Sequence, residues 1–186
     1  MRKPKVYGTV LVASMLALWV LAACGIPGVA GSGTTGPAHD ETGYRLSDGP
    51  PAPDWVLETL DKDVFQLADH QGKVVVMFFM ASWCTSCVIE AQALAQLSDT
   101  YADQGLVVVA INVEPQKNYE GLTQFRRIAG DASYVWAFDD QFVVSKRYGV
   151  NALDTTIIID RGGRIAYTDA FITPFDVLEA EVRKWL

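Results

Sequence analysis

The sequence predicts an α/β domain in which helices flank a central mixed β-sheet, and three observations carry this prediction. Two continuous apolar runs, 73–81 and 106–113, are typical of strands buried on both faces. Segments with a helical spacing of apolar residues follow these runs, so strands and helices alternate along the chain. Near the C-terminus, two strand-like segments flank the turn Arg161–Gly163, which indicates a hairpin before the last helix.

The other elements follow in order. Two short extended pieces separated by a turn predict an N-terminal β-hairpin extension at 55–60 and 64–66. The helix after the first buried strand begins near Cys84 and ends at Gly105, a typical C-terminal stop. The remaining expected elements are strands at 106–113, 134–138, 155–160 and 164–170 and helices at 118–130, 140–149 and 173–186. Thr173 is the predicted N-cap of the final helix.

The N-terminal segment has the layout of an export signal. Three basic residues precede the apolar stretch Val6–Val20, so we assign residues 1–23 as a lipoprotein-type signal peptide. The sequence "LAAC" resembles a bacterial lipobox, which implies lipidation of Cys24; ordinary cleavage and an uncleaved anchor are the alternatives. Residues 24–45 are rich in Gly, Ser, Thr and Pro and predict a flexible tether to a domain at 46–186. We therefore expect an exported, lipid-anchored protein whose domain faces the extracytoplasmic side.

The composition argues against some partners. The net charge of −7 and the lack of a basic cluster argue against nucleic-acid binding. We expect no cofactor and no bound metal.

Cys84 and Cys87 have C-x-x-C spacing at the junction of a buried strand and a helix. A structural zinc site needs about four ligands, and no second C-x-x-C is present. A purely structural disulfide would close too small a loop to restrict the unfolded chain much. A redox pair fits better, because a helix N-terminus favours the thiolate and lowers its pKa. Cys84 would be the nucleophile, and Cys87, one turn on, would attack the mixed disulfide.

The stretches "FFMASWCTSC", "PDWVLETLDKDVFQLADHQGKVVVMFF" and "YGVNALDTTIIIDRGGRIAY" together resemble the thioredoxin superfamily. The domain is similar to its TlpA/ResA/CcmG-like extracytoplasmic branch, which is related to the AhpC/TSA redoxins. The resemblance implies a thioredoxin-like fold and a thiol–disulfide oxidoreductase that reduces disulfides in extracytoplasmic proteins. It also implies a place in cytochrome c or metal-centre maturation, with electrons from a CcdA/DsbD-like membrane donor.

The resemblance also implies roles for individual residues. Trp83 precedes the nucleophile, and Leu153 and Thr155 lie in the loop that faces the cysteine pair, so all three are expected at the substrate-docking edge. Glu90 lies three residues after Cys87 on the same helix face and would tune the thiols and transfer protons. Ordinary packing is the alternative for Trp83, and a solvated helix glutamate is the alternative for Glu90.

Asp154 departs from the family pattern, which has a cis-proline at this position. A cis bond before a non-proline residue costs roughly 2.5–4 kcal/mol, so the Leu153–Asp154 bond is either trans or a costly cis bond. A carboxylate facing Cys84 would disfavour the thiolate, act as a local acid or base, or help the two thiolates bind a metal. We therefore include Asp154 among the candidate catalytic residues. The alternative is that its side chain turns to solvent.

Three other functions use the same residues differently. A metallochaperone would bind a soft metal through Cys84 and Cys87, because thiolates select such ions. A thiol peroxidase normally has Pro and Thr ahead of its cysteine, and "FMASWC" has neither. The intact cysteine pair argues against a non-catalytic binding module.

Overall fold

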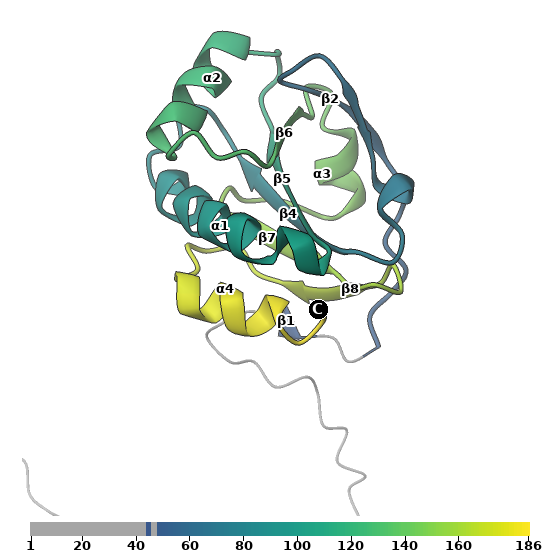
Figure 1. Cartoon of the computed structure of the whole chain (residues 1–186). Helices are drawn as coiled ribbons and strands as arrows, with labels where there is room; N and C mark the ends of the chain where they lie inside the picture. The colour runs from purple at the N-terminus through teal and green to yellow at the C-terminus, as the bar shows by residue number, and fades with distance from the viewer. Residues whose placement is uncertain (1–43, 46–47) are drawn as a thin grey trace, which may run out of the picture. The chain divides into compact units, whose positions relative to one another are not determined.

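The computed structural model describes residues 44–45 and 48–186 (Figure 1). The predicted signal peptide, the lipidation site Cys24 and nearly all of the predicted tether lie outside the described residues. No helix in the described part of the chain combines the length and the apolar character needed to cross a bilayer.

One mixed sheet organises the described residues. Its eight strands have the order β1-β8-β7-β4-β5-β6-β2-β3. The strands are β1 Tyr44–Arg45, β2 Val56–Thr59, β3 Val64–Gln66, β4 Val74–Met80, β5 Leu106–Asn112, β6 Val135–Phe138, β7 Thr155–Ile159 and β8 Ile165–Thr168. The helices are α1 Cys87–Tyr101, α2 Tyr119–Ile128, α3 Val143–Arg147 and α4 Phe175–Val182, with short 3-10 turns at Leu67–His70 and Ala102–Gln104.

The centre of the sheet is made by the two apolar runs. β4 is buried along its whole length and pairs parallel with β5 and antiparallel with β7. β7 continues antiparallel to β8, while β2 pairs antiparallel with both β3 and β6. A strand that is covered on both faces has no polar side to present to water, which explains the unbroken apolar sequence of β4.

Two hydrophobic cores lie on opposite faces of this sheet. Alternate β4 residues such as Phe78 and Met80 pack with buried residues of α1, α2 and α4. The intervening residues, such as Met77 and Phe79, pack with Trp55, which precedes β2, and with residues of β3, β5, β7 and α3. α1 and α4 lie side by side over the first core (Figure 1). The period-two alternation of β4 thus fixes which face carries α1, and therefore where the cysteine pair lies.

The structure corrects one capping prediction. α4 begins at Phe175 with Pro174 as its N-cap, so the assignment of Thr173 as the cap is wrong. The hydroxyl of Thr173 donates instead to a carboxylate oxygen of Asp169 at 2.6 Å. A charge-assisted bond to a buried carboxylate is stronger than a neutral cap, and it holds this side chain away from the helix.

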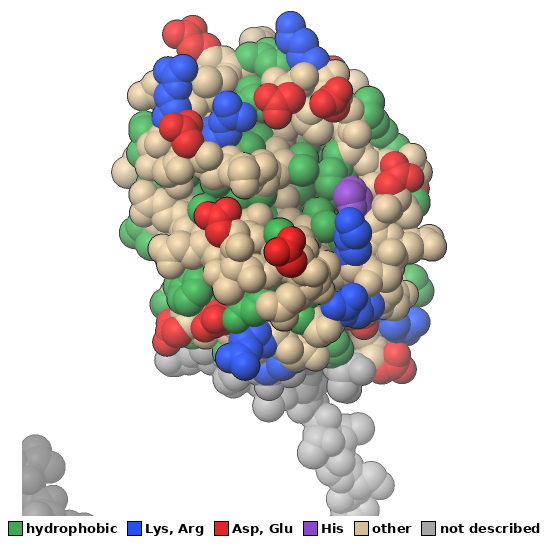
Figure 2. Space-filling view, in the orientation of Figure 1, with side chains coloured by type: hydrophobic (Ala, Val, Ile, Leu, Met, Phe, Trp, Pro, Cys, Tyr) green, Lys and Arg blue, Asp and Glu red, His purple; other side chains and the backbone are tan. Residues whose placement is uncertain are grey.

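One face of the molecule, seen in Figure 2, carries mixed charge. Acidic and basic side chains are interspersed there among polar and apolar ones. This face therefore offers no extended field of one sign to steer a highly charged partner.

Candidate active site

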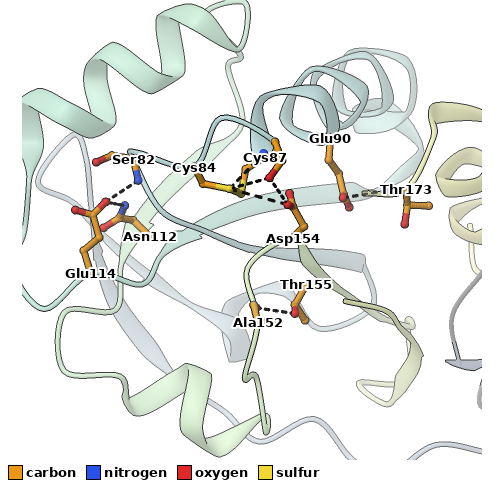
Figure 3. Close-up of a disulfide and its surroundings, with 11 residues drawn as sticks. Ser82, Cys84, Cys87, Glu90, Asn112, Glu114, Ala152, Asp154, Thr155 and Thr173 are labelled. Carbon is orange, nitrogen blue, oxygen red and sulfur yellow. Dashed lines mark hydrogen bonds between the residues drawn. A yellow bond between two sulfur atoms is a disulfide. The ribbon is translucent and has the colours of Figure 1, made fainter. Parts of the chain in front are cut away.

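The cysteine pair lies between the carboxyl end of β4 and the start of α1. Cys84 and Cys87 form a disulfide, with 5.4 Å between their Cα atoms (Figure 3). The side chain of Cys84 keeps 6% exposure, whereas Cys87 is fully buried. Because β4 and β5 are parallel, this end of the sheet is the edge where α/β domains usually carry their chemistry.

The sulfur of Cys84 faces the first turn of α1. The backbone N–H of Cys87 points at Cys84 Sγ, with 3.3 Å between nitrogen and sulfur. The hydroxyl oxygen of Ser86 also lies 3.3 Å from this sulfur. Free N–H groups at a helix N-terminus stabilise negative charge, so the reduced Cys84 would meet an environment that favours the thiolate.

Asp154 lies directly opposite this sulfur. It comes from the loop before β7, and its side chain points toward the disulfide (Figure 3). Oδ2 lies 3.9 Å from Cys84 Sγ and accepts a hydrogen bond from the Ser86 hydroxyl at 2.8 Å. Asp154 is only 8% exposed, so the alternative in which it turns to solvent is wrong.

The backbone at Asp154 is unusual in another respect. The described residues contain no cis peptide bond, so the Leu153–Asp154 bond is trans. Asp154 has a φ of 55°, in the left-handed region, where aspartate is more frequent than most residues. The hydroxyl of Thr155 donates to Ala152 O at 2.9 Å and helps to hold this turn. A left-handed residue in a trans loop thus brings the carboxylate to the disulfide.

One oxygen of Asp154 has no partner. Oδ1 is buried and makes no hydrogen bond, although Oδ2 is bonded to Ser86. One carboxylate oxygen of Asp154 and the two sulfur atoms of Cys84 and Cys87 all lie within 4.8 Å of one another. A buried polar atom without a partner costs about 1–3 kcal/mol, so this oxygen calls for an explanation.

Glu90 is buried one helical turn beyond Cys87. It is 0% exposed, so the alternative of a solvated helix glutamate is wrong. Its Oε1 accepts from the Thr156 hydroxyl at 2.5 Å, and its Oε2 accepts from the Thr173 backbone N–H at 3.1 Å. Burial raises the pKa of Glu90 to about 8, although the bond from Thr156 opposes the shift.

Asp169 completes a closed arrangement around the same two threonines. The backbone N–H of Thr156 donates to Oδ1 of Asp169 at 3.1 Å, and the Thr173 hydroxyl donates to Oδ2. Each threonine therefore binds one carboxylate through its backbone and the other through its hydroxyl. Tyr167 also donates to Oδ2 of Asp169, at 2.7 Å. Burial is the main cause of the raised pKa of Asp169.

The family model described as AhpC/TSA family matches residues 49–168. The chain belongs to the AhpC/TSA family. This membership confirms the recognised relationship, and the mixed sheet described above confirms the α/β prediction.

Relatives of this AhpC/TSA chain are named for thiol–disulfide chemistry. It is 36% identical over 118 residues to the thiol-disulfide oxidoreductase ResA of Geobacillus thermodenitrificans, covering 63% of this chain and 66% of the relative. It is 32% identical over 120 residues to the thioredoxin-like protein YneN of Bacillus subtilis, covering 64% of this chain and 69% of the relative. The chain thus spans just under two thirds of the length of that ResA.

Solved structures confirm the thioredoxin-like fold. A protein from Chlorobium tepidum, described as a candidate DsbE thiol:disulfide interchange protein, has a TM-score of 0.67 and 30% identity. The similarity covers 75% of this chain and 97% of that one. A thioredoxin-like protein from Aeropyrum pernix has a TM-score of 0.60 and 26% identity, covering 70% of this chain and 89% of that one.

The expected docking residues of this AhpC/TSA chain lie in different environments. Trp83 is 71% exposed beside the disulfide, whereas Leu153 packs partly buried against the first core. Thr155 is buried at the start of β7. Their roles in docking stay predictions. Of the three, only Trp83 offers a large exposed side chain to a partner.

Several polar residues of this site are not evident from the sequence alone. No sequence motif singles out Ser86, Thr156 or Asp169. Thr156 and Asp169 are 13 residues apart and meet because β7 and β8 pair antiparallel. The one available sequence signal for this network was the position of Thr155, Thr156 and Asp169 at the two ends of the predicted hairpin.

Proposed function

We propose that this protein is a thiol–disulfide oxidoreductase that cycles Cys84 and Cys87 between a dithiol and a disulfide. The observation that carries the proposal is the asymmetry of the pair. Cys84 keeps 6% exposure and its sulfur faces the backbone N–H of Cys87 at the start of α1, while Cys87 itself is fully buried. The names of the relatives support the same chemistry.

The exchange proceeds in two displacements. The thiolate of Cys84 attacks one sulfur of the substrate disulfide, forming a mixed disulfide and releasing one substrate thiolate, which takes up a proton. The thiolate of Cys87 then attacks Cys84 Sγ, which closes the internal disulfide and releases the second substrate thiol. Two electrons pass to the substrate, and a thiol donor must return two electrons to the pair before the next cycle.

Glu90 would serve proton transfer in the second displacement. A carboxyl group with a pKa of about 8 carries a proton at neutral pH, and it lies on the same helix face as Cys87. At neutral pH the protonated fraction of Glu90 can supply a proton to a departing thiolate, and only its ionised fraction can take up the proton that the Cys87 thiol loses before its attack. Glu90 would act as an acid–base residue, and Asp169 would hold it in place through the two threonines.

The cellular setting of the proposal rests on the sequence. The export signal and the "LAAC" motif support an extracytoplasmic domain held at the membrane by a lipid on Cys24. The resemblance supports substrates that are disulfide-bearing extracytoplasmic proteins, including those of cytochrome c or metal-centre maturation, and a CcdA/DsbD-like donor. Mass spectrometry of the mature N-terminus should find an acylated Cys24; an intact Met1 would exclude the anchor.

Single cysteine variants test the assigned roles. With a disulfide substrate, Cys84→Ser should abolish turnover, because no nucleophile remains. Cys87→Ser should accumulate mixed disulfides, visible by non-reducing electrophoresis and mass spectrometry, because the resolving thiol is gone. Asp99→Asn, which changes an exposed residue of α1, is the matched control and should leave turnover unchanged. If Cys87→Ser forms no mixed disulfide and Cys84→Ser does, the two roles are reversed.

A further inference from the structure

The reduced cysteine pair and Asp154 present three metal-binding atoms at one point. The two sulfurs and a carboxylate oxygen lie within 4.8 Å of one another, and all three residues are buried. Cys84 lies in the turn before α1 and Cys87 is its first residue, while Asp154 comes from the loop before β7, 70 residues after Cys84. The fold therefore adds a third donor to a two-residue motif.

The second observation is the state of the Asp154 carboxylate. Its Oδ1 is buried without a hydrogen-bond partner, and Asp154 takes part in none of the ion pairs formed among residues 48–186. Reduction of the disulfide would place at least one thiolate beside this carboxylate. Two buried negative groups this close repel each other unless a proton or a cation lies between them.

We propose that the reduced form of the protein binds one divalent cation of the zinc type through Cys84, Cys87 and Asp154. The inference goes beyond disulfide exchange, because it concerns equilibrium binding to the dithiol rather than turnover. It also revises the expectation of no metal, and it takes up the alternative in which Asp154 helps the two thiolates bind an ion. Here three protein ligands leave a fourth position for water, as in open zinc sites.

The distances suit such an ion. With zinc–sulfur bonds of about 2.3 Å and a zinc–oxygen bond of about 2.0 Å, tetrahedral geometry separates the two sulfurs by ~3.8 Å and sulfur from oxygen by ~3.5 Å. Asp154 Oδ2 already lies 3.9 Å from Cys84 Sγ. Once the S–S bond is broken, the sulfurs need only move apart within the turn Cys84–Cys87. Oδ2 can bind the ion and still accept the Ser86 hydroxyl through its second lone pair, and a rotation of the carboxylate would instead offer Oδ1, which has no partner.

The donor set selects the class of ion. Two thiolates disfavour magnesium and calcium, which take oxygen ligands. A carboxylate adds little for copper(I), which thiolates alone satisfy, but it is an ordinary ligand for zinc. Because the disulfide removes both thiolates, binding should depend on the redox state. A metal held by Cys84 would also occupy the nucleophile, so zinc should inhibit exchange reversibly.

Metal titration of the purified full chain tests the inference. The protein is reduced, freed of reductant without air, and titrated with Zn²⁺ against a chromophoric chelator. One equivalent should bind to the reduced protein and none to the oxidised protein. In parallel, Co²⁺ should give the absorption of a tetrahedral site together with thiolate charge-transfer bands.

Variants separate the proposed site from a simple dithiol chelate. Loss of even an outer-shell partner weakens metal binding by about 10- to 100-fold, so Asp154→Asn should weaken Zn²⁺ binding at least tenfold. Binding of copper(I) should change little. The matched control is Asp99→Asn, which removes one exposed carboxylate from α1 and should leave the Zn²⁺ affinity unchanged. Asp154→Ser serves as a second variant if Asp154→Asn proves unstable.

Two results would overturn the inference. One is that the reduced protein binds Zn²⁺ no more tightly than Cys84→Ser. The other is that Asp154→Asn and Asp154→Ser bind Zn²⁺ as tightly as the unchanged chain, which would leave only a dithiol chelate. Turnover is measured with chelator in the same preparation. Turnover without zinc binding rejects only the metal site, and zinc binding without turnover rejects only the oxidoreductase assignment.

Discussion

Two groups of buried acidic side chains lie near the disulfide, and they differ in how many of their oxygens accept hydrogen bonds. In the first, every carboxylate oxygen of Glu90 and Asp169 accepts a hydrogen bond, from two threonines and Tyr167. In the second, Asp154 has one oxygen bonded to an exposed serine and one oxygen with no partner. The first group has all of its hydrogen-bond acceptors satisfied within the protein, whereas the second has an acceptor left for a ligand.

The first group stabilises the fold and fixes a protonation state. Its bonds join α1, β7 and the segment before α4, so it holds together elements that are distant in sequence. The second group contributes little to folding, because its one bond goes to a residue that water can reach. Buried carboxyl groups in one site can thus either stabilise the fold or bind a ligand. The number of hydrogen-bond donors that each group contacts distinguishes the two roles.

The largest contrast should come from the same substitution in both groups. Asp169→Asn replaces one acceptor oxygen with an N–H₂ group among three donors, and should lower the free energy of unfolding by about 2 kcal/mol. Asp154→Asn should lower it by less than about 0.5 kcal/mol, because Oδ1 has no bond to lose. Urea unfolding of the oxidised proteins measures both values. If both variants lost the same free energy of unfolding, the two groups of carboxylates would not differ in their contribution to stability.

The pH dependence of stability sharpens the comparison further. The pKa of Glu90 rises from 4.5 to about 8 on folding, chiefly through burial, with Asp169 and Asp154 adding like charge. Between these values the unfolded chain releases a proton that the folded chain keeps. The stabilising contribution is therefore complete below pH 4.5 and is lost as pH rises to about 8, at up to ~1.4 kcal/mol per pH unit.

Glu90→Gln should flatten this decline, because the side chain no longer titrates. Unfolding midpoints measured from about pH 5 to pH 8 give the slope for each protein. Asp99→Asn, which removes an exposed carboxylate from the same helix, should keep the slope of the unchanged chain. A Glu90→Gln slope equal to that of the unchanged chain would place the titrating group elsewhere, with Asp169 as the nearest candidate.

The smallest expected effect is on the thiol itself. In the reduced, metal-free protein, Asp154→Asn removes a negative charge near Cys84 and should lower the pKa of Cys84 by up to about one unit. Alkylation near neutral pH should then be faster than in the unchanged chain. The pH profile of alkylation with chelator present measures the shift. An identical profile in the two proteins would mean that the carboxylate acts on bound metal or on backbone shape rather than on the thiol.

The parts of this molecule that the sequence predicted are those with local signals. The apolar runs of β4 and β5 predicted central strands because burial on both faces leaves no polar position. The C-x-x-C spacing identified the cysteine pair because both cysteines lie within one short stretch of sequence. The nearness of Asp154 to Cys84 came from the resemblance, since no local pattern joins residues so far apart in the sequence.

The acidic network lay beyond local reasoning. Thr173 carried the pattern of a helix cap, yet the carboxylate of Asp169 captured its hydroxyl, and that competition depends on tertiary packing. The partnership of Thr156 with Asp169 depends on the register of β7 against β8, which includes an irregularity between Ile158 and Ile159. Register and loop geometry are set by the whole sheet, so a single stretch of sequence does not reveal them.

The left-handed backbone at Asp154 also bears on how this chain can evolve. Proline fixes φ near −65°, about 120° from the 55° observed here, so a single codon change to proline would break the turn instead of restoring the usual family loop. Recovery would require Leu153 and Thr155 to rearrange in the same step. Asparagine and glycine tolerate this backbone and are the accessible neighbours, and both discard the charge. Lineages that carry this aspartate should therefore diverge toward uncharged loops more easily than they revert.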